Sequence, residues 1–325
     1  MFRNLTIFAI LLALFVVVLG AYVRLSDAGL GCPDWPGCYG NLIIDEGHDE
    51  VLKANETFAE RPFEASKAWK EMIHRYFASG LGLVILILMV MAWRRPSLGQ
   101  RGLTSSLSLL VIFQGALGMW TVTLLVKPAI VVSHLLGGLA TLSLLFWLLL
   151  RLNNKRLLVS QASNSVKRLA KLGLVVLIAQ IALGGWTSTN YAALACPDFP
   201  ACFAGNWTPS LDYSEGFVLW RGLGVDYEFG VLSNEARAAI HWVHRLGAVV
   251  TTAILAYLAV KLFTMRARKE ATILLTLLCT QVMLGILNVV LSLPLSIAVA
   301  HNGVAALLLL SMVYVNFRLK KIDIK

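Results

Sequence analysis

The residues best suited to chemistry are four histidines inside apolar stretches, namely His74, His134, His244 and His301. A titratable side chain inside a membrane segment is costly and by default marks a functional site. Two neutral imidazoles that face each other across a helix bundle can ligate a haem iron from both sides. A lone histidine of this kind is more often a packing residue. Four in repeated positions favour bis-histidine haem ligation, with one haem in each half.

Two other histidines and a bare metal ion must be weighed against this interpretation. Zinc and copper sites usually add cysteine or carboxylate ligands at short spacing, whereas the members of each pair are far apart in the chain. His241 lies three residues before His244, on roughly the same helical face, and is an alternative ligand. The following arginine and the repeat described below favour His244. His48 has no partner by spacing and is expected to be a solvated loop residue.

Glu71 occupies the place in the first half that His241 occupies in the second, three residues before the histidine. A carboxylate directed at a haem edge could act as a base or stabilise positive charge on the macrocycle. The structural alternative is a residue that meets the positive end of a helix dipole. The difference between the halves favours a catalytic role for Glu71.

Arginines follow two of the histidines, at Arg75 and Arg245. They could contact haem propionates through paired hydrogen bonds. A boundary arginine that extends its guanidinium to water is the alternative, and Arg24 has the same ambiguity.

Four cysteines form two Cys-x5-Cys pairs between apolar segments. On the oxidising side of a membrane, disulfides Cys32–Cys38 and Cys196–Cys202 are the favoured interpretation. Metal binding is a weaker one, and a redox-active dithiol stays open. Cys279 lies within an apolar segment and is expected to be a small buried residue.

The elements that must position these residues are membrane helices. The chain has 325 residues, of which 58% are hydrophobic and 14% charged, so we predict an all-α integral membrane protein. Eight apolar segments are long enough to span a bilayer. They are 5–23, 70–92, 104–125, 130–150, 170–189, 238–262, 270–292 and 296–316.

The net charge of +10 is unevenly distributed. With the N-terminus inside, one side of the membrane holds 18 of the 28 Lys and Arg residues. This bias predicts that both termini are cytoplasmic and that the cysteine loops and histidines lie toward the outer side. No nucleic-acid partner is needed to explain the charge. The first segment resembles a signal peptide, but its repeat counterpart cannot be one, so we predict a retained helix. No amphipathic, Arg-rich transit peptide precedes it, which favours a bacterial plasma (inner) membrane over an organelle.

The pattern of the first half restarts after residue 168. Corresponding features are the two cysteine motifs, the two His-Arg pairs, and the Gln-x3-Gly motifs that precede His134 and His301 by the same interval. We therefore predict two tandem four-helix bundles in the same orientation, related by a pseudo-twofold axis along the membrane normal. Their ranges are 1–150 and 169–325, with a cytoplasmic linker at 151–168. Gln114, Gln180 and Gln281, each four residues before a glycine, are expected to make interhelical hydrogen bonds.

With these residues assembled, the chain resembles the haem A synthase family of bacterial and mitochondrial membranes. The resemblance covers essentially the whole chain. It is carried by Tyr22 to Pro36 (YVRLSDAGLGCPDWP), by Glu71-x-x-His74-Arg75, and by the spacing of the other three histidines. The first of these motifs is long and specific.

The resemblance implies that the protein oxidises the C8 methyl of haem O to a formyl group, through hydroxylated intermediates, in cytochrome oxidase biogenesis. It implies a substrate haem at His74 and His134 and a haem b cofactor at His244 and His301. Glu71 falls on the catalytic carboxylate of the family, and the pair Cys32 and Cys38 falls on the cysteines of its first outer loop.

Two other classes of function stay open at this stage. A quinol-linked di-haem b cytochrome would use the same four histidines, and a haem carrier or oxidase assembly factor would bind haem without oxidising it. The expected partners are haem O, which a haem O synthase could hand over, membrane lipid and an unnamed electron acceptor. A homo-oligomer is also compatible with the sequence.

Overall fold

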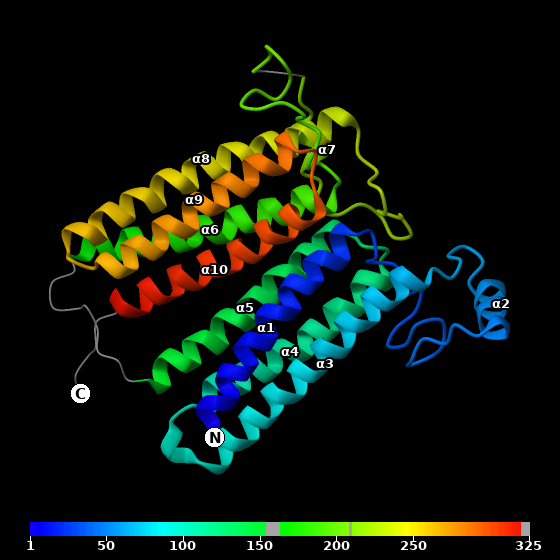
Figure 1. Ribbon diagram of the computed structural model, residues 1–325, viewed down its shortest axis with the longest axis horizontal. Helices are drawn as coiled ribbons and strands as arrows, with labels where there is room; N and C mark the ends of the chain where they lie inside the picture. Colours follow the sequence, from blue (N-terminus) through cyan, green and yellow to red (C-terminus); the bar gives the residue numbers. More distant parts are fainter. Residues whose placement is uncertain (154–162, 208–209, 320–325) are drawn as a thin grey trace.

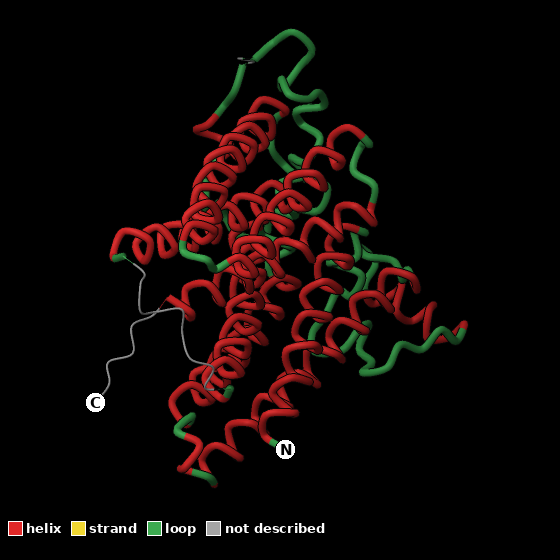
Figure 2. The backbone as a smooth tube through the Cα atoms, turned by 60° about the vertical axis from the view of Figure 1, so that its left-hand side comes forward, coloured by secondary structure: helices red, strands yellow, loops and turns green. Residues whose placement is uncertain are grey.

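The computed structural model describes residues 1–153, 163–207 and 210–319 (Figure 1). Within these ranges the chain consists of helices and connecting loops, without a β-strand (Figure 2). The long helices run side by side, and loops gather at the end of the molecule where α2 and α7 lie (Figure 1). The predicted all-α class is confirmed.

In the described part of the chain, eight helices are long and apolar enough to cross a membrane. They are α1 (Phe2–Leu25), α3 (Ala65–Arg94), α4 (Arg101–Thr123), α5 (Pro128–Leu152), α6 (Asn164–Thr189), α8 (Asn234–Thr264), α9 (Arg268–Val290) and α10 (Leu295–Leu319). Each coincides with one predicted span, and their ends differ by a few residues. Length and hydropathy were sufficient to find them because the thickness of a bilayer sets both.

Three short helices were not expected from the sequence. They are α2 (His48–Thr57), η1 (Pro96–Leu98) and α7 (Tyr213–Gly216). His48 is exposed as expected, but it begins α2 instead of lying in a loop. Cys279 was expected to be buried and is exposed on α9. Its neighbour Leu278 takes the inward position, and consecutive helical residues cannot share one face.

The turns that end the helices repeat between the two halves. Leu125 and Val126 follow α4 with φ of 51° and 50°, and Ser292 and Leu293 follow α9 with φ of 57° and 61°. A left-handed backbone is uncommon for residues other than glycine, especially β-branched ones. Its recurrence at matching positions supports the internal repeat.

The contacts between helices form two closed rings. In the first, α1 packs on α3 and α5, and α4 packs on the same two helices; in the second, α6 and α9 each pack on α8 and α10. This pattern is consistent with two tandem four-helix bundles. The rings meet through α1, α5, α6 and α10. In the predicted linker, α5 continues to Leu152 and α6 begins at Asn164, whereas residues 154–162 lie outside the described part of the chain.

Candidate functional site

Each of the four histidines packs against a glycine of a neighbouring helix. The pairs are Gly20 with His74, Gly118 with His134, Gly184 with His244, and Gly285 with His301. A Cβ atom added to these glycines would lie between 3.0 and 3.5 Å from Cε1 of the ring. The four rings therefore lie directly against helix backbone, and the packing limits their orientation.

The structure brings the histidines together in the predicted pairs. His74 on α3 and His134 on α5 are electrostatic neighbours, and so are His244 on α8 and His301 on α10. In each case the two helices lie opposite each other in their ring. A ligand pair that spans a bundle requires this arrangement.

Glutamines contact three of the four histidines. Gln114 donates to the main-chain oxygen of His134 at 2.9 Å. The Nε2 atom of Gln180 lies 3.0 Å from Nδ1 of His244. The Nε2 atom of Gln281 lies within 3.3 Å of both ring nitrogens of His301. The predicted interhelical role of these glutamines is confirmed.

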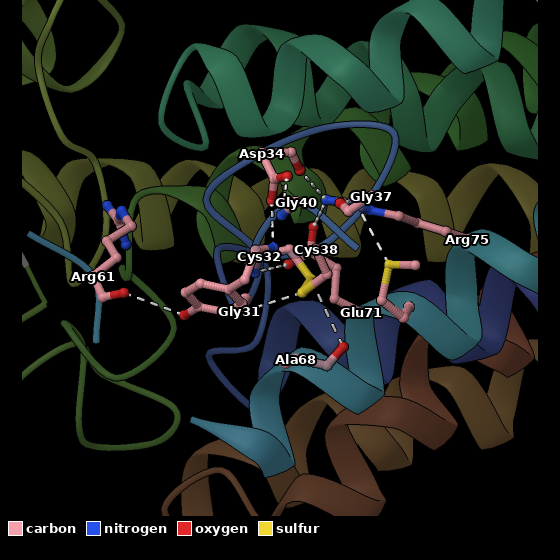
Figure 3. Close-up of a disulfide and its surroundings, with 12 residues drawn as sticks. Gly31, Cys32, Asp34, Gly37, Cys38, Gly40, Arg61, Ala68, Glu71 and Arg75 are labelled. Atoms are coloured by element: carbon pink, nitrogen blue, oxygen red, sulfur yellow. Dashed lines mark hydrogen bonds and ion pairs between the residues drawn. A yellow bond between two sulfur atoms is a disulfide. The ribbon is translucent and has the colours of Figure 1, made fainter. Parts of the chain in front are cut away.

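Glu71 is 5% exposed, and both of its carboxylate oxygens are engaged. Oε1 lies 2.6 Å from Nη2 of Arg75, and Oε2 accepts a hydrogen bond of 2.9 Å from the main-chain N–H of Cys32. Figure 3 shows the carboxylate between the cysteine loop and the arginine. The side chain thus anchors the loop to α3.

The guanidinium of Arg75 also holds this loop. It donates to the main-chain oxygens of Asp34, Pro36 and Gly37. Arg245 makes corresponding contacts in the second half, with the main-chain oxygens of Cys196, Asp198 and Ala201. The sequence did not reveal these contacts, because the acceptors are backbone atoms 38 to 49 residues away along the chain. Contact with haem propionates stays a prediction.

His241 holds the second cysteine loop as Glu71 holds the first. Its Nδ1 accepts from the N–H of Cys196 at 3.2 Å, and its Nε2 lies 3.2 Å from Nε of Arg245. Both ring nitrogens are therefore engaged. This leaves His244, which packs on Gly184, as the better candidate ligand on α8.

Both predicted disulfides are present, Cys32–Cys38 and Cys196–Cys202. All four cysteines are buried between their loop and the adjacent long helix. Each bridge closes the loop that the neighbouring arginine holds.

The donor set fits haem better than a bare metal ion. Among the residues that the structure describes, no three His, Cys, Asp or Glu side chains are grouped closely enough to hold a metal ion. Nδ1 of His74 and Nδ1 of His134 are buried without a hydrogen-bond partner. Paired imidazoles across a bundle, each against a glycine, suit a flat ligand with an iron at its centre.

Comparison with known proteins identifies the family of this chain. A family model described as cytochrome oxidase assembly protein (COX15-CtaA) matches residues 3–313. A heme A synthase of Shewanella oneidensis is 50% identical over 308 residues, which are 94% of this chain and 92% of that protein. A heme A synthase of Rhizorhabdus wittichii is 27% identical over 334 residues, covering 94% and 90%. The chain therefore belongs to the COX15-CtaA family of cytochrome oxidase assembly proteins.

Proposed function

We propose that this chain is a haem A synthase, a membrane oxidoreductase that converts haem O to haem A. The reaction oxidises the C8 methyl of the macrocycle to a formyl group through hydroxylated intermediates. The observation that carries the proposal is the 50% identity to a heme A synthase over 94% of the chain. The paired histidines also support the proposal, because two such pairs can hold two haems, one as substrate and one as cofactor.

The two haems have different roles in this proposal. His74 and His134 bind the substrate haem, and His244 and His301 hold a haem b cofactor. When bound, haem b supplies one-electron transfer between the substrate site and an external acceptor. The glycine beside each histidine lets the helix backbone approach the imidazole closely.

Glu71 is the catalytic carboxylate of the proposed site. It lies three residues before His74, and the second half has no acidic counterpart there. Arg75 and the N–H of Cys32 orient its two oxygens. A fixed negative charge beside the substrate stabilises the positive charge that develops as electrons leave, and a carboxylate can also accept a proton from the reacting group.

The cysteine loops and the histidines face the outer side of a bacterial inner membrane, and both termini are cytoplasmic. This orientation follows from the excess of Lys and Arg in the inner loops. Haem O enters laterally from the bilayer, with its tail in lipid and its propionates toward the outer surface.

Extraction and mass analysis of the bound haems tests the function. We expect haem b together with haem O, its hydroxylated form or haem A. Haem b alone would instead indicate a di-haem electron-transfer cytochrome. Bound haem O without any oxidised product would indicate a haem carrier.

Two substitutions of Glu71 separate its charge from its structural contacts. Glu71→Ala should abolish haem A formation and leave haem binding largely intact. Glu71→His introduces the side chain that holds the equivalent loop in the second half, so it should keep the loop in place and still abolish haem A formation. Normal turnover in either variant, measured by haem extraction, would show that Glu71 is not catalytic.

A further inference from the structure

The two halves differ in how firmly they hold their imidazoles. In the second half, Nε2 of Gln180 lies 3.0 Å from Nδ1 of His244 and donates at 3.0 Å to the main-chain oxygen of the same residue. A Cβ atom on Gly247 would lie 2.2 Å from Oε1 of Gln180. The glycine therefore makes room for the amide.

The first half has no such contact on its corresponding helix. Gln180 lies four residues before Gly184, and Val16 lies four residues before the matching Gly20. A valine side chain has no hydrogen-bonding group, and Nδ1 of His74 is buried without a partner among the residues that the structure describes. Phe77 stands where the second half has Gly247, three residues after the histidine.

The second pair of histidines does not show this difference. Nε2 of Gln281 lies 3.3 Å from Nδ1 and 3.2 Å from Nε2 of His301, so it does not single out Nδ1. Gln114 donates to the main-chain oxygen of His134, as Gln180 does to that of His244, and its Oε1 is likewise buried without a partner among the described residues. The difference between the halves therefore lies at Gln180 and Val16.

We propose that Gln180 is a positioning residue that makes the second half retain its haem, and that the valine at the corresponding place in the first half, Val16, lets that haem exchange. The proposal rests on the assignment of one haem to each histidine pair. It gives a structural reason why the first half handles substrate and product while the second keeps a cofactor.

The physical basis is the hydrogen bond behind a metal-bound histidine. An imidazole that ligates through Nε2 carries its proton on Nδ1, and a partner for that proton fixes the ring and makes it a stronger ligand. The Oε1 atom of Gln180 is buried without a partner. Rotation of the amide lets this oxygen accept the Nδ1 proton of His244. Losing such a partner typically costs about 10- to 100-fold in metal affinity.

The first test measures haem loss from the purified full-length protein to excess apomyoglobin, with mass analysis of the haems that remain. Gln180→Val should speed the loss of haem b by about 10- to 100-fold and leave the loss of haem O and haem A unchanged. Equal rates of haem b loss in the variant and the parent would overturn the proposal.

The reciprocal variant moves the contact to the first half. Val16→Gln with Phe77→Gly supplies both the amide and the space beside His74. We expect haem O and haem A to leave this variant more slowly than the parent, with haem b loss unchanged. Unchanged loss of haem O and haem A in a folded protein would contradict the inference independently of the Gln180 variant.

A conservative variant separates positioning from packing. Gln180→Glu keeps the size of the side chain and offers a stronger acceptor to Nδ1, so haem b should be retained and its reduction potential should fall. Retention with an unchanged potential would show that Gln180 only fills space. If the parent makes no haem A but these haem b effects appear, the proposed function fails and the role of Gln180 stands.

Discussion

Glu71 and His241 occupy the same position in the two repeats and make the same two contacts. Each accepts a hydrogen bond from the main-chain N–H of the first cysteine of its loop and also contacts the arginine one turn later. The anchoring of the loop therefore does not require a carboxylate. What distinguishes Glu71 is its negative charge, and the proposed catalysis depends on that charge.

Arg75 should be essential for the fold of the first cysteine loop and the start of α3. Its side chain is 13% exposed and pairs with Glu71, whose side chain is 7% exposed. Removing one partner of a buried ion pair typically costs about 3–5 kcal/mol, because the other charge stays buried. We expect Arg75→Ala to lower the thermal unfolding temperature in detergent markedly, and Arg75→Ala with Glu71→Gln to recover part of it. A double variant less stable than Arg75→Ala would contradict this account.

Tyr39, which directly follows the first cysteine loop, should make this part of the protein less stable at high pH. Its hydroxyl donates to the main-chain oxygens of Arg61 and Pro62. Burial, reinforced by the charge of Glu64, raises the pKa of Tyr39 from 10.0 to about 12. Because the folded state favours the neutral phenol, this contribution to stability is complete below pH 10 and is lost as the pH rises through about 12.

The titration of Tyr39 can be measured by phenolate absorbance. The difference between the parent and Tyr39→Phe should show a midpoint near pH 12. A midpoint near 10, the ordinary value for tyrosine, would indicate that the hydroxyl is solvated.

At the scale of elements, the segment that leads into α8 crosses from the second half to the first. We call residues 218–229 the strap. Tyr227 N–H donates to the main-chain oxygen of Leu125 at 3.2 Å. Lys127 is 2% exposed. Its Nζ donates to the main-chain oxygen of Gly222 in the strap at 2.8 Å and lies 3.6 Å from the ring centroid of Trp220. The second half thus covers the α4–α5 turn of the first.

Two ion pairs connect the strap to the segment between α2 and α3. Arg61 contacts Asp226 at 2.6 Å and Glu228 at 2.8 Å. We expect Asp226→Asn with Glu228→Gln to increase hydrogen exchange in the strap about fivefold, since such pairs contribute up to about 1 kcal/mol. Lys53→Met, at an exposed pair elsewhere, is the control and should change nothing there. Unaltered exchange in the double variant would mean that the backbone and Lys127 contacts suffice.

At the scale of the whole molecule, the two halves also join near the C-terminal ends of α1 and α6. Arg24 donates to the main-chain oxygen of Ser188 at 2.8 Å, and its guanidinium lies 4.3 Å from the ring centroid of Tyr191. Ser188 is the repeat counterpart of Arg24. Equivalent positions that touch each other are expected at a pseudo-twofold axis, so this contact lies where the predicted axis would pass.

The orientation of the molecule can be tested by labelling. In a Cys279→Ser background, Glu60→Cys lies in the segment predicted to be outside, and Ser97→Cys lies in a turn predicted to be cytoplasmic. A membrane-impermeant maleimide should label the first variant in intact cells and the second only after lysis. The reverse result would invert the predicted topology.

The sequence by itself determined the helices, the repeat and the histidine pairs. Helix positions followed from apolar length, because a bilayer imposes one thickness on every span. The pairing of His74 with His134, and of His244 with His301, followed from comparing the halves at equal intervals. Both inferences use information local to a segment or repeated along the chain.

Only the tertiary structure decided how the residues around these histidines are used. Arg75 and Arg245 hold loop carbonyls, His241 engages both ring nitrogens, and Gln180 contacts an imidazole where Val16 cannot. These contacts join residues tens of positions apart through backbone atoms and close helix approaches. Residue type and spacing do not specify such contacts, because they depend on how the helices are rotated and packed against one another.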